Sequence, residues 1–313
     1  MILCVGGTPA MQRTLLFESL AVGDVNRARK LYVTASGKVV NAARTVSTLG
    51  SESLLVTFLG GDAGRFVSRT LDVEDVPHEA VWVEDDAPTR TCVTVLEEDG
   101  PVTELVEEAP PVSNGDVAAL ESIVKKHLNE ARALCLIGSF PPGVPDDFYA
   151  RLAAQAAVAG IPVLVDAQKS LLLNTLAEHP FLVKPNLDET QAALDLPAGD
   201  DESSGLEAVS ALVEKGARWA LVTRGAEPAL LGDESGGRWR IESPKIQAVN
   251  PIGSGDTLAG GLLHALSGGA SVPEAAAFGT ACAAANALTP TSGVFDANEA
   301  KRLLPDVRLV RLH

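Results

Sequence analysis

Short apolar runs that lead into glycine or a polar turn recur along the chain, with room for a helix between most of them. The clearest runs lie at residues 1–5, 54–59 and 133–137, and each leads directly into glycine. Two more follow at 162–166 and 219–223. Apolar runs of about 4–8 residues bounded by turn signals are typical of strands buried on both faces of a sheet. The pattern therefore predicts a set of buried parallel strands.

Other segments carry apolar residues at the spacing of a helix. They predict helices near residues 39–49, 117–128, 148–159, 206–215 and 275–288. Strands that alternate with helices and end in glycine predict an α/β fold with a doubly wound, mostly parallel sheet flanked by helices. Although 313 residues allow one large or two ordinary domains, the alternation continues along the chain, and we expect residues 1–313 to form a single domain.

Two segments depart from this alternation. Residues at about 12–34 and 80–108 contain short strand-like runs with polar turns and no helical pattern between them. They predict a small antiparallel sheet outside the main one. Such a sheet is suited to be a β lid over a substrate site.

Charge and cysteine content narrow the class of protein. The formal net charge of −16 argues against nucleic-acid and anionic-membrane partners, so an anionic substrate would need basic residues gathered in its pocket. The chain has no apolar run of about 20 residues and no basic segment ahead of its first apolar run, so we expect neither a membrane span nor a signal peptide. Its four cysteines show no metal-binding spacing. We expect free thiols and a cytoplasmic location.

The stretch with the most distinctive chemistry is the glycine-rich turn at residues 249–261. Gly253 and Gly255 flank Ser254, and a helical pattern follows Asp256. A flexible turn at a helix N-terminus presents free amides and a positive dipole end to an anion. Asp256 should stay ionised there and can accept a proton from an alcohol. The alternative is an ordinary strand-turn-helix junction with Asp256 as a helix cap.

Lys38 and Asn41 form a second candidate group at a predicted helix start. Gly37 permits close approach of a ligand, and Lys38 places a point charge beside it. Asn41 lies near the start of the same helix. The alternative for Lys38 is a solvated surface lysine.

The turn and its surroundings resemble a known family. PIGSGDTLAGG at 251–261 is similar to the signature of the ribokinase-like (PfkB) carbohydrate kinases. Further segments resemble that family in the same order, and they include GDVNR at 23–27, SGKVVNAAR at 36–44, GSFPPG at 138–143 and KPNLDE at 184–189. With Arg90, they resemble most the branch of 1-phosphofructokinase and tagatose-6-phosphate kinase.

This resemblance implies a ribokinase-like fold and an ATP-dependent sugar kinase. Asp256 would be the catalytic base, and the amides of Gly253, Ser254 and Gly255 would stabilise the transferring phosphoryl group. The cofactors would be ATP and Mg²⁺, and the lid would often also form the contact of a homodimer. The acceptor would be a phosphorylated hexose of the fructose 1-phosphate or tagatose 6-phosphate type.

The resemblance also implies residues that bind the acceptor. Lys38 and Arg90 would hold its phosphate with help from Ser139, and the alternative for Arg90 is a charge that blunts a strand edge. Gln12 stands where the family usually has a sugar-binding aspartate. An amide can hydrogen-bond hydroxyl groups but lacks the charge of a carboxylate.

The remaining candidates concern the nucleotide and the metal. Asn186 and Glu189 match an N-x-x-E pair that the family associates with magnesium, and the same pair can form a helix capping box. The residues expected near the nucleotide are Lys184, Thr223, Gly225, Glu227, Gly253, Gly255 and Asn286. For Asn286 the alternative is a helix C-cap.

Two rival functions stay open at this point. One is a kinase for a non-phosphorylated sugar or a nucleoside, which would need a carboxylate near Gln12. The other is a non-catalytic sugar-phosphate sensor, suggested by Gln12 and by a glycine that the family has after Glu227 and this chain lacks.

Overall fold

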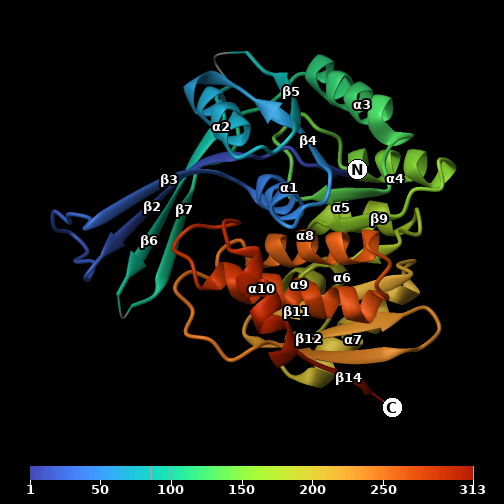
Figure 1. Cartoon of the computed structure of the whole chain (residues 1–313). Helices are drawn as coiled ribbons and strands as arrows, with labels where there is room; N and C mark the ends of the chain where they lie inside the picture. Colours follow the sequence, from blue (N-terminus) through green and yellow to red (C-terminus); the bar gives the residue numbers. More distant parts are fainter. Residues whose placement is uncertain (85–86, 99, 313) are drawn as a thin grey trace.

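The computed structural model describes residues 1–84, 87–98 and 100–312 (Figure 1). Residues 85, 86 and 99 belong to the segment predicted as lid and lie outside the described residues. The described chain forms a large sheet covered by helices and a smaller sheet that projects from its side (Figure 1). None of the described helices is both long and apolar enough to cross a membrane.

The main sheet contains ten strands within the described residues. From β11 to β5 neighbouring strands are parallel, and from β11 to β14 they are antiparallel. In spatial order the strands are β14 (Arg308–Leu312), β13 (Arg238–Glu242), β12 (Glu227–Asp233), β11 (Trp219–Arg224), β10 (Leu182–Val183), β9 (Val163–Asp166), β8 (Ala133–Ile137), β1 (Ile2–Val5), β4 (Ser53–Leu59) and β5 (His78–Trp82). The predicted α/β class with a mostly parallel sheet is confirmed.

Helices cover both faces of this sheet, because its central strands are apolar on both sides. In β1, Leu3 and Val5 face one core, and Ile2 and Cys4 face the other. The first core is closed by α3 (Asn114–Leu128), α4 (Phe148–Val158), α5 (Lys169–Leu176), α6 (Leu187–Leu194) and α7 (Glu202–Glu214). The second is closed by α1 (Lys38–Thr48), α2 (Gly61–Val73), α8 (Ser254–Ser267) and α9 (Val272–Ala287). Next to α9 lie α10 (Ala297–Leu303) and the 3₁₀ turn η1 (Leu304–Asp306).

The smaller sheet is the predicted lid, with one change of boundary. Its strands run in the order β3 (Lys30–Ser36), β2 (Ala10–Phe17), β6 (Arg90–Glu97) and β7 (Val102–Val106). The outer pairings are antiparallel, and the central β2–β6 pairing is parallel. Residues 80–82, expected in the lid, instead belong to β5 at the edge of the main sheet. The connection β4–α2–β5 joins parallel neighbours as a crossover unit, which explains the difference.

Helix α8 is packed closely on two neighbours. A Cβ atom added to Gly260 would lie 2.6 Å from Cβ of Thr45 on α1, and one added to Gly261 would lie 2.8 Å from Sγ of Cys282 on α9. Only glycine leaves room for these approaches. The small residues of the predicted helix therefore fix where the N-terminus of α8 lies.

Candidate active site

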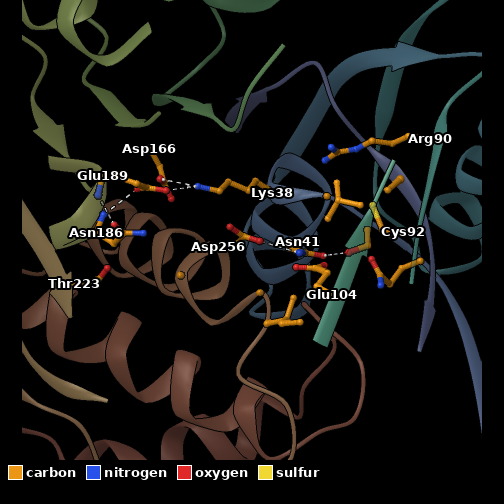
Figure 2. Close-up of a pocket in the computed structure, with 18 of the residues that line it drawn as sticks. Lys38, Asn41, Arg90, Cys92, Glu104, Asp166, Asn186, Glu189, Thr223 and Asp256 are labelled. Atoms are coloured by element: carbon orange, nitrogen blue, oxygen red, sulfur yellow. Dashed lines mark hydrogen bonds and ion pairs between the residues drawn. The ribbon is translucent and has the colours of Figure 1, made fainter. Parts of the chain in front are cut away.

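A cavity of about 400 Å³ lies at the carboxyl ends of the parallel strands, beneath the lid (Figure 2). Its walls come from the ends of β9 and β11, from the N-terminal ends of α1 and α8, and from β2, β6 and β7 of the lid. Ligands of open α/β sheets bind at this edge. The cavity brings together most of the candidates named from the sequence.

The glycine-rich turn is held rigidly at one wall of the cavity. Gly253 is the N-cap of α8 with φ 80°, and an added Cβ would lie 2.7 Å from Cβ of Ser292. Asn286 is fully buried and donates to the carbonyl of Ile252 at 3.0 Å and to Oγ of Ser254 at 3.1 Å. Its carbonyl oxygen accepts from the amide of Gly293 at 2.7 Å. Asn286 thus holds the turn in place and does not line the cavity, and its expected contact with the nucleotide stays a prediction.

Ser254 also points away from the cavity. Its amide donates to the carbonyl of Pro251 at 3.1 Å, and its hydroxyl donates to the carbonyl of Ala283 at 3.1 Å. Gly253 and Gly255 line the cavity, and Ser254 does not. Of the three backbone amides expected to bind an anion, those of Gly253 and Gly255 therefore remain the candidates.

Asp256 lies in the first turn of α8 with only 7% of its surface exposed. Asn41 on α1 donates from Nδ2 to Oδ2 of Asp256 at 2.8 Å. Ser36 and Arg44 donate to Oδ1 of Asn41 at 3.3 Å and 3.4 Å, which turns the amide nitrogen toward Asp256. Asn41 therefore orients the carboxylate, and because it also lines the cavity, its expected contact with substrate stays a prediction.

The pKa of Asp256 is raised toward neutral pH. Burial raises its pKa to about 6, and the positive charge of Lys38 only partly opposes this effect. A carboxylate with such a pKa is ionised at pH 7 yet is more basic than an exposed aspartate. This combination suits a group that takes a proton from an alcohol.

A cluster of alternating charges lines the cavity beside the glycine-rich turn (Figure 2). Nζ of Lys184 lies 2.8 Å from Oδ2 of Asp166, and both side chains are almost fully buried. Nζ of Lys38 lies 3.4 Å from Oδ1 of Asp166 and 3.6 Å from Oε1 of Glu189. The negative charge of Asp166 is the main reason that the pKa of Lys38 is raised well above its usual value. Lys38 is therefore a permanent cation at the cavity, not a solvated surface lysine.

The donors in this cluster fit a partly hydrated magnesium ion. Asp166 and Glu189 both contact Nζ of Lys38, so their carboxylates lie near one another, and Asn186 adds an amide oxygen close by. Asn186 and Glu189 form the capping box of α6, which confirms that interpretation of the pair, and their association with magnesium stays a prediction. Among the described residues no group of three or more His, Cys, Asp or Glu gathers as a metal site. Mg²⁺ here would keep waters or take phosphate oxygens as its other ligands.

Arg90 and Ser139 meet at a neighbouring cavity of about 280 Å³. Lys38 and Arg90 line both cavities, and Ser139 lines the second, so the two cavities adjoin at Lys38 and Arg90. Arg90 donates to the carbonyl of Thr8 at 3.1 Å, and its buried Nε has no hydrogen-bond partner among the described residues. A guanidinium with unused donors beside a lysine is suited to an anion.

Besides Asn286, two more candidates of the nucleotide group lie outside the cavity lining. Gly225 and Glu227 sit at the turn between β11 and β12, beyond Thr223, which does line the cavity. Two lining carboxylates were missed as candidates. Asp166 stands at the end of β9, where strand position was a usable signal, and Glu104 stands on β7, where its pairing with β6 could not be foreseen.

A buried carboxylate at a glycine-rich helix N-terminus shares this cavity with lysines and acidic oxygens, a combination that is suited to phosphoryl transfer. The model of the pfkB family carbohydrate kinases matches residues 1–296. The chain belongs to this family, and it is thus a phosphotransferase with an alcohol group as acceptor.

Solved structures agree over the whole chain. A Staphylococcus aureus protein described as a phosphofructokinase is 27% identical with a TM-score of 0.80, over 100% of this chain and 99% of that one. A Thermotoga maritima protein described as a 1-phosphofructokinase is 24% identical with a TM-score of 0.90, over 100% and 99%. The ribokinase of Arabidopsis thaliana, complexed with ribose and ATP, is 21% identical with a TM-score of 0.76, over 97% and 98%.

Proposed function

We propose that this kinase transfers the γ-phosphate of ATP to a hydroxyl of a phosphorylated hexose of the fructose 1-phosphate or tagatose 6-phosphate type. Residues 1–313 act as one kinase domain, with the lid over its site. Asp256 accepts the proton of the hydroxyl, and the amides of Gly253 and Gly255 stabilise charge on the transferring group. The observation that carries the proposal is the position of Asp256. It is buried at the N-terminus of α8, oriented by Asn41, and lines the same cavity as Lys38 and Arg90.

The phosphate of the acceptor binds between Lys38, Arg90 and Ser139. These side chains line the second cavity, and two of them also line the first. The chain carries a net charge of −16, so an anionic acceptor depends on such local cations. A sugar whose phosphate occupies the second cavity extends its hydroxyls into the first, toward Asp256.

ATP binds on the other side of Asp256, near Lys184 and Thr223. Lys184 faces the glycine-rich turn, because a Cβ added to Gly255 would lie 3.6 Å from its Nζ. Mg²⁺ held near Asn186, Glu189 and Asp166 would neutralise charge on the nucleotide phosphates. Gly225 and Glu227 remain candidates for parts of the nucleotide that extend beyond this cavity. The Arabidopsis ribokinase complexed with ATP supports this choice of phosphate donor.

A panel of acceptors with ATP and magnesium tests the proposal. Turnover of fructose 1-phosphate or tagatose 6-phosphate, well above that of free fructose, ribose and adenosine, is the expected result. Preference for a non-phosphorylated acceptor would contradict the roles of Lys38 and Arg90. Tight sugar-phosphate binding without any turnover would indicate a sensor.

The raised pKa of Asp256 predicts the acid limb of the pH profile. The base acts only when ionised, so kcat/KM for the acceptor should fall about tenfold per pH unit below a free-enzyme pKa of about 6 and level off above it. The measurement is kcat/KM for the acceptor, at saturating ATP, over pH about 5–8. A profile that stays flat through this range would exclude Asp256 as the base.

Exposed apolar side chains on the lid favour a homodimer. Its strands and the loop between β2 and β3 expose several large apolar side chains, namely Val22, Val25, Leu31, Val33, Leu105 and Val106. Apolar surface of this kind on a soluble sheet commonly marks an interface. Sedimentation of the purified protein should give a dimer, and a monomer at micromolar concentration would contradict it.

The cysteines support a cytoplasmic location. Four buried free thiols fit the reducing environment of the cytoplasm.

A further inference from the structure

The inner face of the lid presents an ordered set of polar side chains to the cavity. The register places Gln12 of β2 beside Cys92 of β6, and places Thr94 of β6 opposite Glu104 of β7. Residues directly opposite one another in neighbouring strands point to the same face of a sheet. Gln12, Cys92 and Glu104 accordingly all line the cavity, and Figure 2 shows Glu104 on the same side as Cys92 and Asn41.

Gln12 cannot by itself give this face a negative charge. Its side chain is 3% exposed, and its Nε2 donates to Oγ1 of Thr94 at 2.8 Å. This bond directs the amide and leaves Oε1 as a neutral acceptor. Next to it on β3, the buried hydroxyl of Thr34 has no hydrogen-bond partner among the described residues. Gln12 and Thr34 therefore offer only neutral groups to the hydroxyls of a ligand. A charged hydrogen-bond acceptor has to come from another residue of this face.

Glu104 has the properties of that acceptor. It lies opposite Thr94, whose hydroxyl accepts the bond from Gln12, so Glu104 and Gln12 both lie beside this threonine. Within the described part of the chain it makes no hydrogen bond or ion pair. Its side chain is exposed at the cavity; partial burial still raises the pKa of Glu104, and the nearby charge of Arg90 opposes this shift. An unpaired carboxylate at the cavity is free to accept hydrogen bonds from a ligand.

We propose that Glu104 binds hydroxyl groups of the acceptor sugar and, with Gln12, determines which end of the sugar faces these two side chains. This inference rests on the proposed function, because it assumes a sugar phosphate in the cavity. Like charges repel, so the carboxylate keeps the acceptor's phosphate away from β7 and directs it toward Lys38 and the start of β6, where Arg90 stands. The carboxylate that the sequence lacks at position 12 is thus supplied from β7.

Steady-state kinetics of Glu104→Gln test this role, with fructose 1-phosphate and tagatose 6-phosphate as acceptors. The variant should raise KM for the better acceptor at least ~10-fold, the range expected for loss of a charge-assisted hydrogen bond, and leave KM for ATP within about twofold. The matched control is Glu107→Gln. Glu107 is exposed just past β7 and accepts from the amide of Thr91 at 2.7 Å, a bond that glutamine can keep. This control should change neither constant.

A second variant separates binding from a structural role. Moving the carboxylate back to β2, in the double variant Gln12→Glu with Glu104→Gln, should recover at least part of the lost affinity for the sugar phosphate. An equal rise of KM for ATP and for the acceptor in Glu104→Gln, or no change in either, would overturn the proposal. So would failure of the double variant to recover any affinity.

Failure of the proposed function can be told apart from failure of this inference. Absence of wild-type turnover with both sugar phosphates would concern the function alone, because calorimetric titration with the same compounds in the absence of ATP measures the effect of Glu104 directly. Weaker binding by Glu104→Gln than by wild type would support the inference even then. Equal binding by the two proteins, or no binding by wild type, would overturn it.

Discussion

Replacement of Asp256 by Asn is expected to lower kcat at least ~10²-fold, with little change in the fold. Asparagine keeps the size of the side chain and an oxygen that can accept the bond from Nδ2 of Asn41, now 2.8 Å long. It cannot accept a proton from the acceptor hydroxyl. The expected loss is therefore in kcat, measured at saturating concentrations of ATP and sugar phosphate.

A matched control comes from another helix of the same chain. Asp116 occupies the third position of α3 as Asp256 does in α8, and it lies in a capping box on the surface, outside the cavity lining. Asp116→Asn should cost some stability through the cap and leave kcat unchanged. Turnover of Asp256→Asn close to that of the control would rule out the base.

Replacement of Lys184 by Met is expected to lower the free energy of unfolding by about 3 kcal/mol at pH 7. The side chains of Lys184 and Asp166 are 3% and 2% exposed, and their charged atoms are 2.8 Å apart. Loss of the lysine leaves a buried carboxylate with Lys38 at 3.4 Å as its remaining charged partner. Urea unfolding of both proteins measures the difference.

The stability lost in Lys184→Met should depend on pH, because it involves the charge of Asp166. Burial alone would raise the pKa of Asp166, but Lys184 and Lys38 outweigh it and hold the pKa below its usual value. The stabilisation is present above the unfolded-state pKa of about 3.9 and is lost as pH falls through the folded-state pKa. The difference between wild type and variant should therefore shrink in acid.

Lys126→Met is the matched control for Lys184→Met. Lys126 pairs with Glu79 at 3.1 Å on the surface, where ion pairs contribute about 1 kcal/mol or less. If both variants lose the same amount of stability, the buried pair is no stronger than an exposed one, which would contradict the prediction.

The sequence predicts the fold well where the local pattern of apolar residues alone decides in which sheet a strand lies. Apolar runs that end in glycine predict buried parallel strands, and the structure has β1, β4 and β8 there. Residues 80–82 were misassigned because a short alternating run fits an edge strand of either sheet. Only the crossover through α2 decides between them.

For the site, the sequence predicts residues whose neighbours in the chain carry the chemistry. Asp256, Lys38 and the pair of Asn186 and Glu189 stand at helix starts, and all line the cavity. Ser254 lies two residues before Asp256, and Asn286 lies far along the chain on α9, yet hydrogen bonds turn both side chains into the protein. Glu104 was missed because only the strand register of the lid places it on the same face as Gln12.

The two sheets divide the work of the enzyme. Groups assigned to phosphoryl transfer stand on α8, α1 and the ends of the main-sheet strands, while Gln12 and Glu104 belong to a separate four-stranded layer. The glycines of α8 that pack against α1 and α9 leave no room for larger side chains, whereas Glu104 stands on β7, whose side chains are mostly exposed. Acceptor preference in this scaffold is thus open to redesign by exchanging lid residues, without rebuilding the part that handles ATP.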